Sequence, residues 1–102
     1  MKVIDPGHVY SLSSYAGENE YILNFIHKEP DEENKLVIEK DGTTNEEVLE
    51  MLLHRLKWLQ NRLPSRETAI AITKIEEALL WLNRRTSLRM IQNVENTMKP
   101  HY

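Results

Sequence analysis

The fold is decided by residues 44–88, which read TNEEVLEMLLHRLKWLQNRLPSRETAIAITKIEEALLWLNRRTSL. Apolar side chains recur at steps of three and four on both sides of residues 63–65, which places them on one face of each of two helices. The first stripe holds Val48, Leu52, Leu56, Leu59 and Leu63, and the second holds Ala71, Ile72, Ile75, Leu79 and Leu82. A connection this short joins antiparallel neighbours, so the two stripes are predicted to face each other.

The ends of both helices are also marked in the sequence. Thr44 and Glu47 fit a capping box, in which the threonine hydroxyl accepts a hydrogen bond from the third amide and the glutamate reaches back to the amide of the cap. Pro64 cannot continue a helix interior, and Ser65 can cap the helix that follows. The second helix is expected to end between Leu88 and Asn93.

The first 42 residues are predicted to be rich in β-structure. Short extended runs at residues 3–5, 8–12, 21–26 and 36–38 are separated by turn residues, and the polar run 28–34 is predicted to be a solvated loop. We expect an α+β fold with a small N-terminal antiparallel β-sheet packed on a C-terminal antiparallel two-helix hairpin. The expected single domain spans residues 1–102, with a β-rich part at 1–42, the helical hairpin at 43–92 and a tail at 93–102.

The composition excludes several classes of function. The 102 residues carry a formal net charge of -3 and include no cysteine. A dedicated DNA- or RNA-binding protein normally has a basic excess, so neither polymer is an expected partner, although a few arginines can hold a small anion. Disulfides and thiolate zinc sites are excluded, and no apolar run approaches the roughly 20 residues that cross a bilayer. We expect a cytoplasmic protein without membrane contact.

The sequence contains no recognisable catalytic motif, and we expect no catalytic residue, metal ion or cofactor. Its histidines are scattered, and each is interpreted as a surface or packing residue: His8, His27, His54 and His101. One pattern leaves an enzyme open, because Glu47 and Glu50 have the spacing with which helical nucleotide pyrophosphohydrolases hold magnesium. The second helix lacks a matching acidic pair, so the positive end of the helix dipole explains these glutamates better.

The outward faces of the two helices carry a more suggestive pattern. Each has a line of side chains that sets a tryptophan near cations: Met51, Arg55, Trp58 and Arg62 on the first helix, and Lys74, Ala78, Trp81 and Arg85 on the second. Indole rings stack on nucleobases and guanidinium groups bind phosphate, so a nucleotide would suit these faces. The alternative is that both tryptophans pack against the sheet or another copy of the chain. Both interpretations hold if the ligand binds at a subunit boundary.

Three segments resemble a family of small bacteriophage proteins that block host immune signalling. Residues 64–86, PSRETAIAITKIEEALLWLNRRT, are similar to the hairpin domain shared by the anti-CBASS and anti-Thoeris cyclic-nucleotide sponges. The segments DPGHVY at residues 5–10 and DGTTNEEV at residues 41–48 resemble the anti-Thoeris branch, because the anti-CBASS branch is mostly helical and lacks a β-rich start.

The resemblance implies that a ligand is captured without turnover. Members of this family form hexamers that sequester glycocyclic ADP-ribose, in the anti-Thoeris branch, or cyclic di- and trinucleotides inside the infected bacterial cell. The resemblance assigns base stacking to Trp58, a hydrogen bond with the base to Thr68 and phosphate contact to Arg85. The predicted ligand-binding set also includes Arg84 and Arg89, beside Arg85, and Arg62 on the outward face of the first helix.

Three functions fit the sequence to different degrees. The leading hypothesis is an oligomeric sponge for a cyclic nucleotide signal. The second is a magnesium-dependent nucleotide pyrophosphohydrolase that would use Glu47 and Glu50. The third is a structural phage module whose aromatic faces are protein interfaces.

Overall fold

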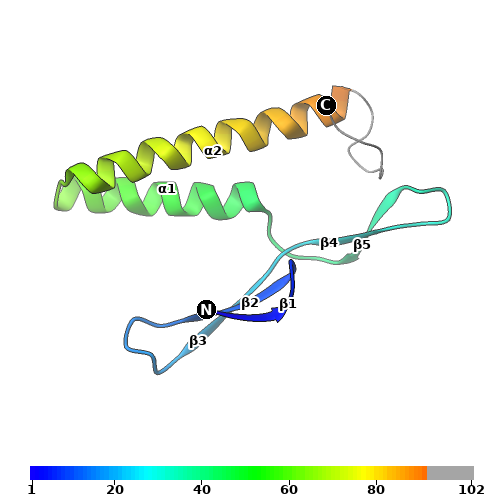
Figure 1. Cartoon of the computed structure of the whole chain (residues 1–102), viewed down its shortest axis with the longest axis horizontal. Coiled ribbons are helices and arrows are strands. Elements are labelled where there is room, and N and C mark those ends of the chain that lie inside the picture. The colour runs from blue at the N-terminus through cyan, green and yellow to red at the C-terminus, as the bar shows by residue number, and fades with distance from the viewer. Residues whose placement is uncertain (92–102) are drawn as a thin grey trace. The chain divides into compact units, whose positions relative to one another are not determined.

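The computed structural model describes residues 1–91, with the side chains of Arg89 and Ile91 excepted. Its elements follow in the order β1 (Lys2–Asp5), β2 (Val9–Ser13), β3 (Glu20–Asn24), β4 (His27–Pro30), β5 (Leu36–Lys40), α1 (Asn45–Arg62) and α2 (Arg66–Ile91) (Figure 1). The predicted α+β class is confirmed, and so is the predicted end of the second helix. Neither described helix is long and apolar enough to cross a membrane.

The chain divides between Thr44 and Asn45 into two compact units, which we call the β unit and the helical unit. The packing of the sheet on the hairpin stays a prediction. The predicted tail at residues 93–102 lies outside the described residues.

In the β unit, β1, β2 and β3 form one antiparallel sheet in that order. The turn between β1 and β2 is closed by the amide of His8, which donates to the carbonyl of Asp5 at 2.9 Å, and Gly7 adopts a φ of 83° there. The loop between β2 and β3 is held by Ser14, whose hydroxyl oxygen accepts from the amides of Glu18 and Asn19, each at 3.1 Å. The antiparallel pairing of β2 with β3 agrees with the antiparallel sheet predicted for the extended runs at residues 8–12 and 21–26.

A second, two-stranded antiparallel sheet is formed by β4 and β5. The predicted loop at residues 28–34 is wrong for residues 28–30, which belong to β4. Polar composition did not exclude a strand, because the side chains of a two-stranded ribbon can stay largely in water. Pro30 is accommodated because it occupies the last position of β4, which is an edge strand. The sequence thus predicted one sheet where the structure has two.

The backbone at Gly42 and Thr43 lies close to the backbone of residues 24–26 and holds the end of the β unit in place. The amide of Thr43 donates to the carbonyl of Asn24 at 2.8 Å, and the amide of Ile26 donates to the carbonyl of Thr43 at 2.9 Å. A Cβ atom on Gly42 would lie 2.5 Å from the carbonyl carbon of Phe25, closer than side-chain atoms approach a backbone. Glycine is required here by space rather than by a left-handed conformation.

In the helical unit, α1 and α2 run antiparallel, joined by residues 63–65 (Figure 1). Ser65 caps α2 as predicted, because its hydroxyl oxygen accepts from the amide of Thr68 at 3.1 Å. The side chain of Gln60 fixes the turn from the other side, accepting from the amide of Ser65 at 3.0 Å and donating to its carbonyl at 3.1 Å. The turn is therefore specified by the side chain of Gln60 in α1 and by Ser65, the cap of α2.

The stripe predicted for α2 is confirmed, because all five of its residues are half-buried. The stripe predicted for α1 is wrong at two of its members, since Leu52 and Leu63 are exposed and Leu49 and Leu53 are half-buried instead. The packed line of α1 runs through Leu49, Leu53, Leu56 and Gln60, and Gln60 is held in place by its bonds to Ser65. Leu63 follows the last residue of α1, so the helix no longer directs its side chain toward α2.

Candidate functional site

Trp58 and Arg62 form a pair in the last two turns of α1. Residues four apart lie over one another on a helix, and the guanidinium carbon of Arg62 lies 5.0 Å from the centre of the Trp58 ring. The indole is 52% exposed. A cation this close to the face of an indole is attracted by the ring electrons. The pair therefore offers both an aromatic surface and a positive charge to the solvent.

Trp81 forms a comparable pair on α2. Trp81 is 68% exposed, and the guanidinium carbon of Arg84 lies 5.8 Å from the centre of its ring. The sequence placed Arg85 on the same line as Trp81, but it is Arg84, three residues away, that lies over the ring. Lys74, on the same line, lies 3.8 Å from the carboxylate of Glu77. The sequence thus predicted that an arginine would lie near Trp81, but not which arginine.

Thr68 belongs to the cap of α2. The hydroxyl of Ser65 donates to the hydroxyl oxygen of Thr68 at 2.8 Å, and Thr68 is half-buried. Its own hydroxyl hydrogen can still be donated, because the bond with Ser65 uses Thr68 only as an acceptor. Thr68 therefore has one directional donor to offer a ligand from the first turn of α2.

The predicted residues fall into two groups along the hairpin. Trp58, Arg62 and Thr68 lie near the connecting turn, and we call them the turn-end group. Trp81, Arg84 and Arg85 lie toward the other end of α2, and we call them the far-end group. At 1.5 Å of rise per residue, Arg85 lies about 25 Å from Thr68 along α2. One chain therefore does not bring Trp58, Thr68 and Arg85 together around one small ligand, and the side chain of Arg89 lies outside the described part.

Two exposed apolar side chains of α2 were not singled out by the sequence pattern. Ile70 and Leu80 are exposed on α2, on the side of the helix opposite its half-buried stripe. Their signal was available in the sequence, since both fall outside the stripe at helical spacing. Exposed apolar side chains on the same helix as Trp81 extend the surface on which a flat ligand or another protein can pack.

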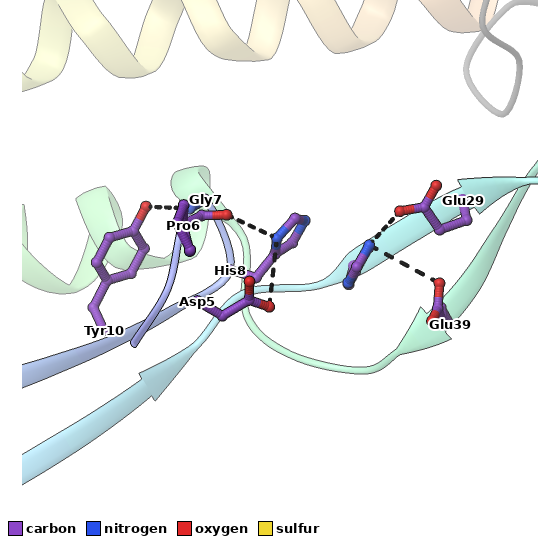
Figure 2. Close-up of polar contacts among 8 residues, drawn as sticks. Asp5, Pro6, Gly7, His8, Tyr10, Glu29 and Glu39 are labelled. Carbon is purple, nitrogen blue, oxygen red and sulfur yellow. Dashed lines mark hydrogen bonds and ion pairs between the residues drawn. The ribbon is translucent and has the colours of Figure 1, made fainter. Parts of the chain in front are cut away.

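A separate cluster of polar side chains lies in the β unit. The Nε2 atom of His27 lies 2.6 Å from Glu29 Oε1 and 4.0 Å from Glu39 Oε2, and Figure 2 shows both carboxylates directed at one ring nitrogen. The ring of His8 stacks on that of His27 with centroids 3.8 Å apart and planes 21° from parallel. His8 and His27 are far apart in the sequence, and the amide of Phe25, which donates to the carbonyl of His8 at 2.7 Å, brings their segments together. Their interpretation as packing residues agrees with this stacking.

The turn before β2 orients His8 from the other side. His8 Nδ1 lies 3.1 Å from the carbonyl oxygen of Pro6 and 3.9 Å from Asp5 Oδ2 (Figure 2). A carbonyl only accepts, so Nδ1 carries a proton when this bond is made. The hydroxyl of Tyr10 accepts from the amide of Gly7 at 2.9 Å and closes the same turn.

Comparison with known proteins places these features in a family. Residues 20–87 match the family described as Acb2/Tad1, hairpin domain. The chain belongs to the Acb2/Tad1 hairpin domain family. The resemblance proposed from the sequence is therefore confirmed at the level of the family.

One relative of this hairpin domain is a protein named Thoeris anti-defense 1, from Bacillus phage SBSphiJ7. It is 48% identical over 58 residues, which make up 56% of this chain and 41% of the relative. The match thus spans about two fifths of the length of the relative.

The part of the chain that matches the hairpin domain contains both predicted groups. It extends from β3 through most of α2, and therefore includes the turn-end group and the far-end group. It ends before Arg89 and begins after His8. The ligand-binding roles of these residues stay predictions.

Proposed function

We propose that this protein is a phage anti-defence sponge, which binds cyclic nucleotide immune signals and sequesters them without degrading them. The proposed ligands are glycocyclic ADP-ribose and cyclic oligonucleotides, and the proposed place of action is the cytoplasm of the infected bacterial host cell. The observation that carries this proposal is the match of residues 20–87 with the Acb2/Tad1 hairpin domain. The name of the phage relative, an anti-defence protein, supports it.

The turn-end group supplies chemistry that suits a nucleotide. An exposed indole provides a stacking surface that any base can use, and such stacking contributes about 1–3 kcal/mol per base. Arg62, held 5.0 Å from the ring of Trp58, adds a cation beside that surface. The hydroxyl of Thr68 can donate one hydrogen bond to a base edge. The far-end group adds Arg84 and Arg85, which can contact phosphate oxygens.

The separation of the two groups supports a site shared between copies of the chain. A cyclic nucleotide is far shorter than the roughly 25 Å between Thr68 and Arg85 along α2. A single ligand that contacts both groups must therefore lie between two protomers. We propose that the protein is a homo-oligomer, a hexamer by its resemblance to the family, with Trp58 of one copy facing Arg85 of another.

A magnesium-dependent pyrophosphohydrolase is the weaker alternative. Within residues 1–91, the side chains that could converge on a metal form two groups in the β unit, and neither includes Glu47 or Glu50. The third hypothesis is a structural phage module, in which the aromatic faces serve only as protein interfaces. It predicts that Arg85→Glu leaves function intact and that Trp58→Ala breaks the assembly.

Calorimetry tests the proposal directly. We expect saturable binding of a cyclic ADP-ribose isomer or a cyclic dinucleotide by the wild-type protein, followed by recovery of the intact ligand when the protein is denatured by heat. Trp58→Ala should weaken binding about tenfold or more, because the base loses its stacking surface. Tyr15→Ala is the matched control, because it removes a fully exposed aromatic ring from the β unit and should leave affinity unchanged.

Mixing two variants tests the shared site. Trp58→Ala and Arg85→Gln should each bind weakly, and a mixture unfolded and refolded together should regain part of the native binding, because some interfaces then join an intact Trp58 to an intact Arg85. Light scattering on each variant checks that assembly is unchanged. No binding of any cyclic nucleotide tested would reject the sponge, and hydrolysed product in the presence of magnesium would favour the enzyme.

A further inference from the structure

The residues proposed to bind the nucleotide all lie in the helical unit. The proposed function therefore gives no role to the histidine cluster of the β unit. Among the described residues, two sets of side chains could converge on a metal ion: Asp5, His8 and His27, and His27, Glu29 and Glu39. In each set the potential ligand atoms lie within 4.8 Å of one another. His27 is common to both sets, and its side chain is only 19% exposed. The cluster is therefore centred on one half-buried imidazole.

The strand register explains how the second set forms. His27 and Glu29 are two apart on β4, so both side chains point to the same face of the sheet. His27 pairs with Lys40 and Lys28 pairs with Ile38, which leaves Glu39 as the extra residue of a β-bulge. A bulge redirects side chains next to it, and here the carboxylate of Glu39 lies 4.0 Å from His27 Nε2. Three ligands of two types, one imidazole and two carboxylates, thus meet between the two strands.

We propose that His27, Glu29 and Glu39 bind a divalent first-row transition-metal ion of the Zn²⁺ type. Ligand atoms about 2.0–2.1 Å from a tetrahedral zinc are about 3.3 Å from each other. The two distances from His27 Nε2, 2.6 Å to Glu29 and 4.0 Å to Glu39, lie on either side of that value. Small rotations of two half-exposed carboxylates would equalise them, so the strands need not move.

The charges of this set also match a divalent ion. The two carboxylates together carry the charge that one M²⁺ neutralises, and the neutral imidazole supplies a nitrogen lone pair. Without an ion, the protonated Nε2 of His27 donates a hydrogen bond to Glu29 Oε1 at 2.6 Å, because an ionised carboxylate only accepts. A bound ion would take the place of that proton, and His27 would stay neutral by carrying its one ring proton on Nδ1, after exchange with water. Both carboxylates are about half exposed, so water can complete the coordination.

The set with Asp5 and His8 is a poorer metal site. The rings of His8 and His27 are stacked 21° from parallel, so their lone pairs, which lie in the ring planes, do not converge on one ion. His8 Nδ1 is also directed at the carbonyl of Pro6 at 3.1 Å. His8 is therefore a positioning residue, which holds the plane of His27 so that Nε2 faces the two glutamates.

The mixed nitrogen and oxygen ligands select a class of ion. Imidazole suits zinc, nickel, copper and iron, whereas magnesium prefers oxygen ligands in near-octahedral geometry and keeps much of its water. We therefore expect Zn²⁺, and Co²⁺ as its spectroscopic substitute, to bind at this site in the presence of millimolar Mg²⁺.

Titration of the metal-free full-length protein with Zn²⁺ tests the site. We expect wild-type protein to bind one tight ion per chain and Glu39→Gln to bind it at least tenfold more weakly, because the amide removes a charge and a strong ligand. Glu39→Gln preserves shape at a half-exposed position, so folding should survive, and circular dichroism checks this. His27→Ala should abolish the tight site. Glu32→Gln and His54→Ala are matched controls on exposed residues and should bind as the wild type does.

Several results would overturn the proposal. These are the absence of tight Zn²⁺ binding to the wild type, equal binding by Glu39→Gln, and displacement of Zn²⁺ by millimolar Mg²⁺. The thermal midpoint gives an independent readout, because an ion that binds only the folded state raises it in the wild type and not in His27→Ala. Nucleotide binding is measured separately with a chelator present, so failure of the metal site leaves the sponge proposal unaffected.

Discussion

The contacts that stabilise the β unit differ from those that stabilise the helical unit in how far apart in the sequence their partners lie. In the helical unit the decisive interactions lie close in sequence, as with Trp58 and Arg62, or Ser65 and Thr68. In the β unit they join distant segments, as when the amide of Phe25 bonds the carbonyl of His8. Local contacts form whenever a helix forms, whereas distant ones require the whole register to be correct. The β unit should therefore depend more strongly on single backbone positions.

The largest expected effect tests this dependence at Gly42. Gly42→Ala places a Cβ atom 2.5 Å from the carbonyl carbon of Phe25, so backbone segments must separate. We expect a loss on the order of 4 kcal/mol or more in the stability of the β unit. Amide resonances of residues 1–44 should collapse or broaden in heteronuclear NMR spectra, while those of α1 and α2 persist.

Gly17→Ala is the control for this substitution. Gly17 has a φ of 79° and nothing within 4 Å of the added methyl group, so only the conformational penalty of about 1 kcal/mol applies. A similar loss for both alanine variants would show that the close approach at Gly42 is not what fastens the β unit.

An intermediate effect is expected when a serine hydroxyl that accepts hydrogen bonds from backbone amides is removed from each unit in turn. Ser65→Ala removes the cap of α2, and Ser14→Ala removes the acceptor for the amides of Glu18 and Asn19. Each should destabilise its own unit by about 1 kcal/mol, because a capped amide loses its partner. Urea unfolding followed at resonances of each unit measures both. If Ser65→Ala destabilises the β unit as much as its own, the units do not unfold independently.

The smallest expected effect concerns an ion pair on the surface of the β unit. The hydrogen bond from Lys2 Nζ, 3.2 Å from Glu20 Oε1, lowers the pKa of Glu20, and a bond from Ser11 lowers it further. Lys2→Met should raise that pKa toward its ordinary value in an NMR titration. Because the pKa is lower in the folded state, the pair stabilises the protein above the unfolded pKa, and this contribution disappears as pH falls through the folded pKa. An unchanged Glu20 titration would exclude Lys2 as the cause.

The sequence predicted most of the helical unit and less of the β unit. The stripe of α2 and the cap at Ser65 depend on neighbours within a few residues, and both were found from spacing alone. The strand β4 was missed because Lys28 and Glu29 are as polar in a solvated ribbon as in a loop. The stacking of His8 on His27 was missed because it follows from strand pairing rather than from any local spacing.

The candidate ligand site shows the same limit. Trp58 and Arg62 were correctly placed on one outward line, because a helix converts spacing into proximity. Spacing could not decide whether Arg84 or Arg85 lies over Trp81, since both are one turn away and rotamers choose between them. The distance between the turn-end group and the far-end group could be deduced from helical rise, but only once both helices were known to be continuous.

The ribbon of β4 and β5 has a consequence for solubility. Both strands are edge strands, and an open edge can recruit strands of other chains into aggregates. Pro30 lacks an amide to donate, and the bulge at Glu39, opposite His27 and Lys28, interrupts the regular ladder. Lys40 adds charge at the last position of β5. These features discourage uncontrolled strand addition. The ribbon therefore resists polymerisation through its open edges even at high protein concentration.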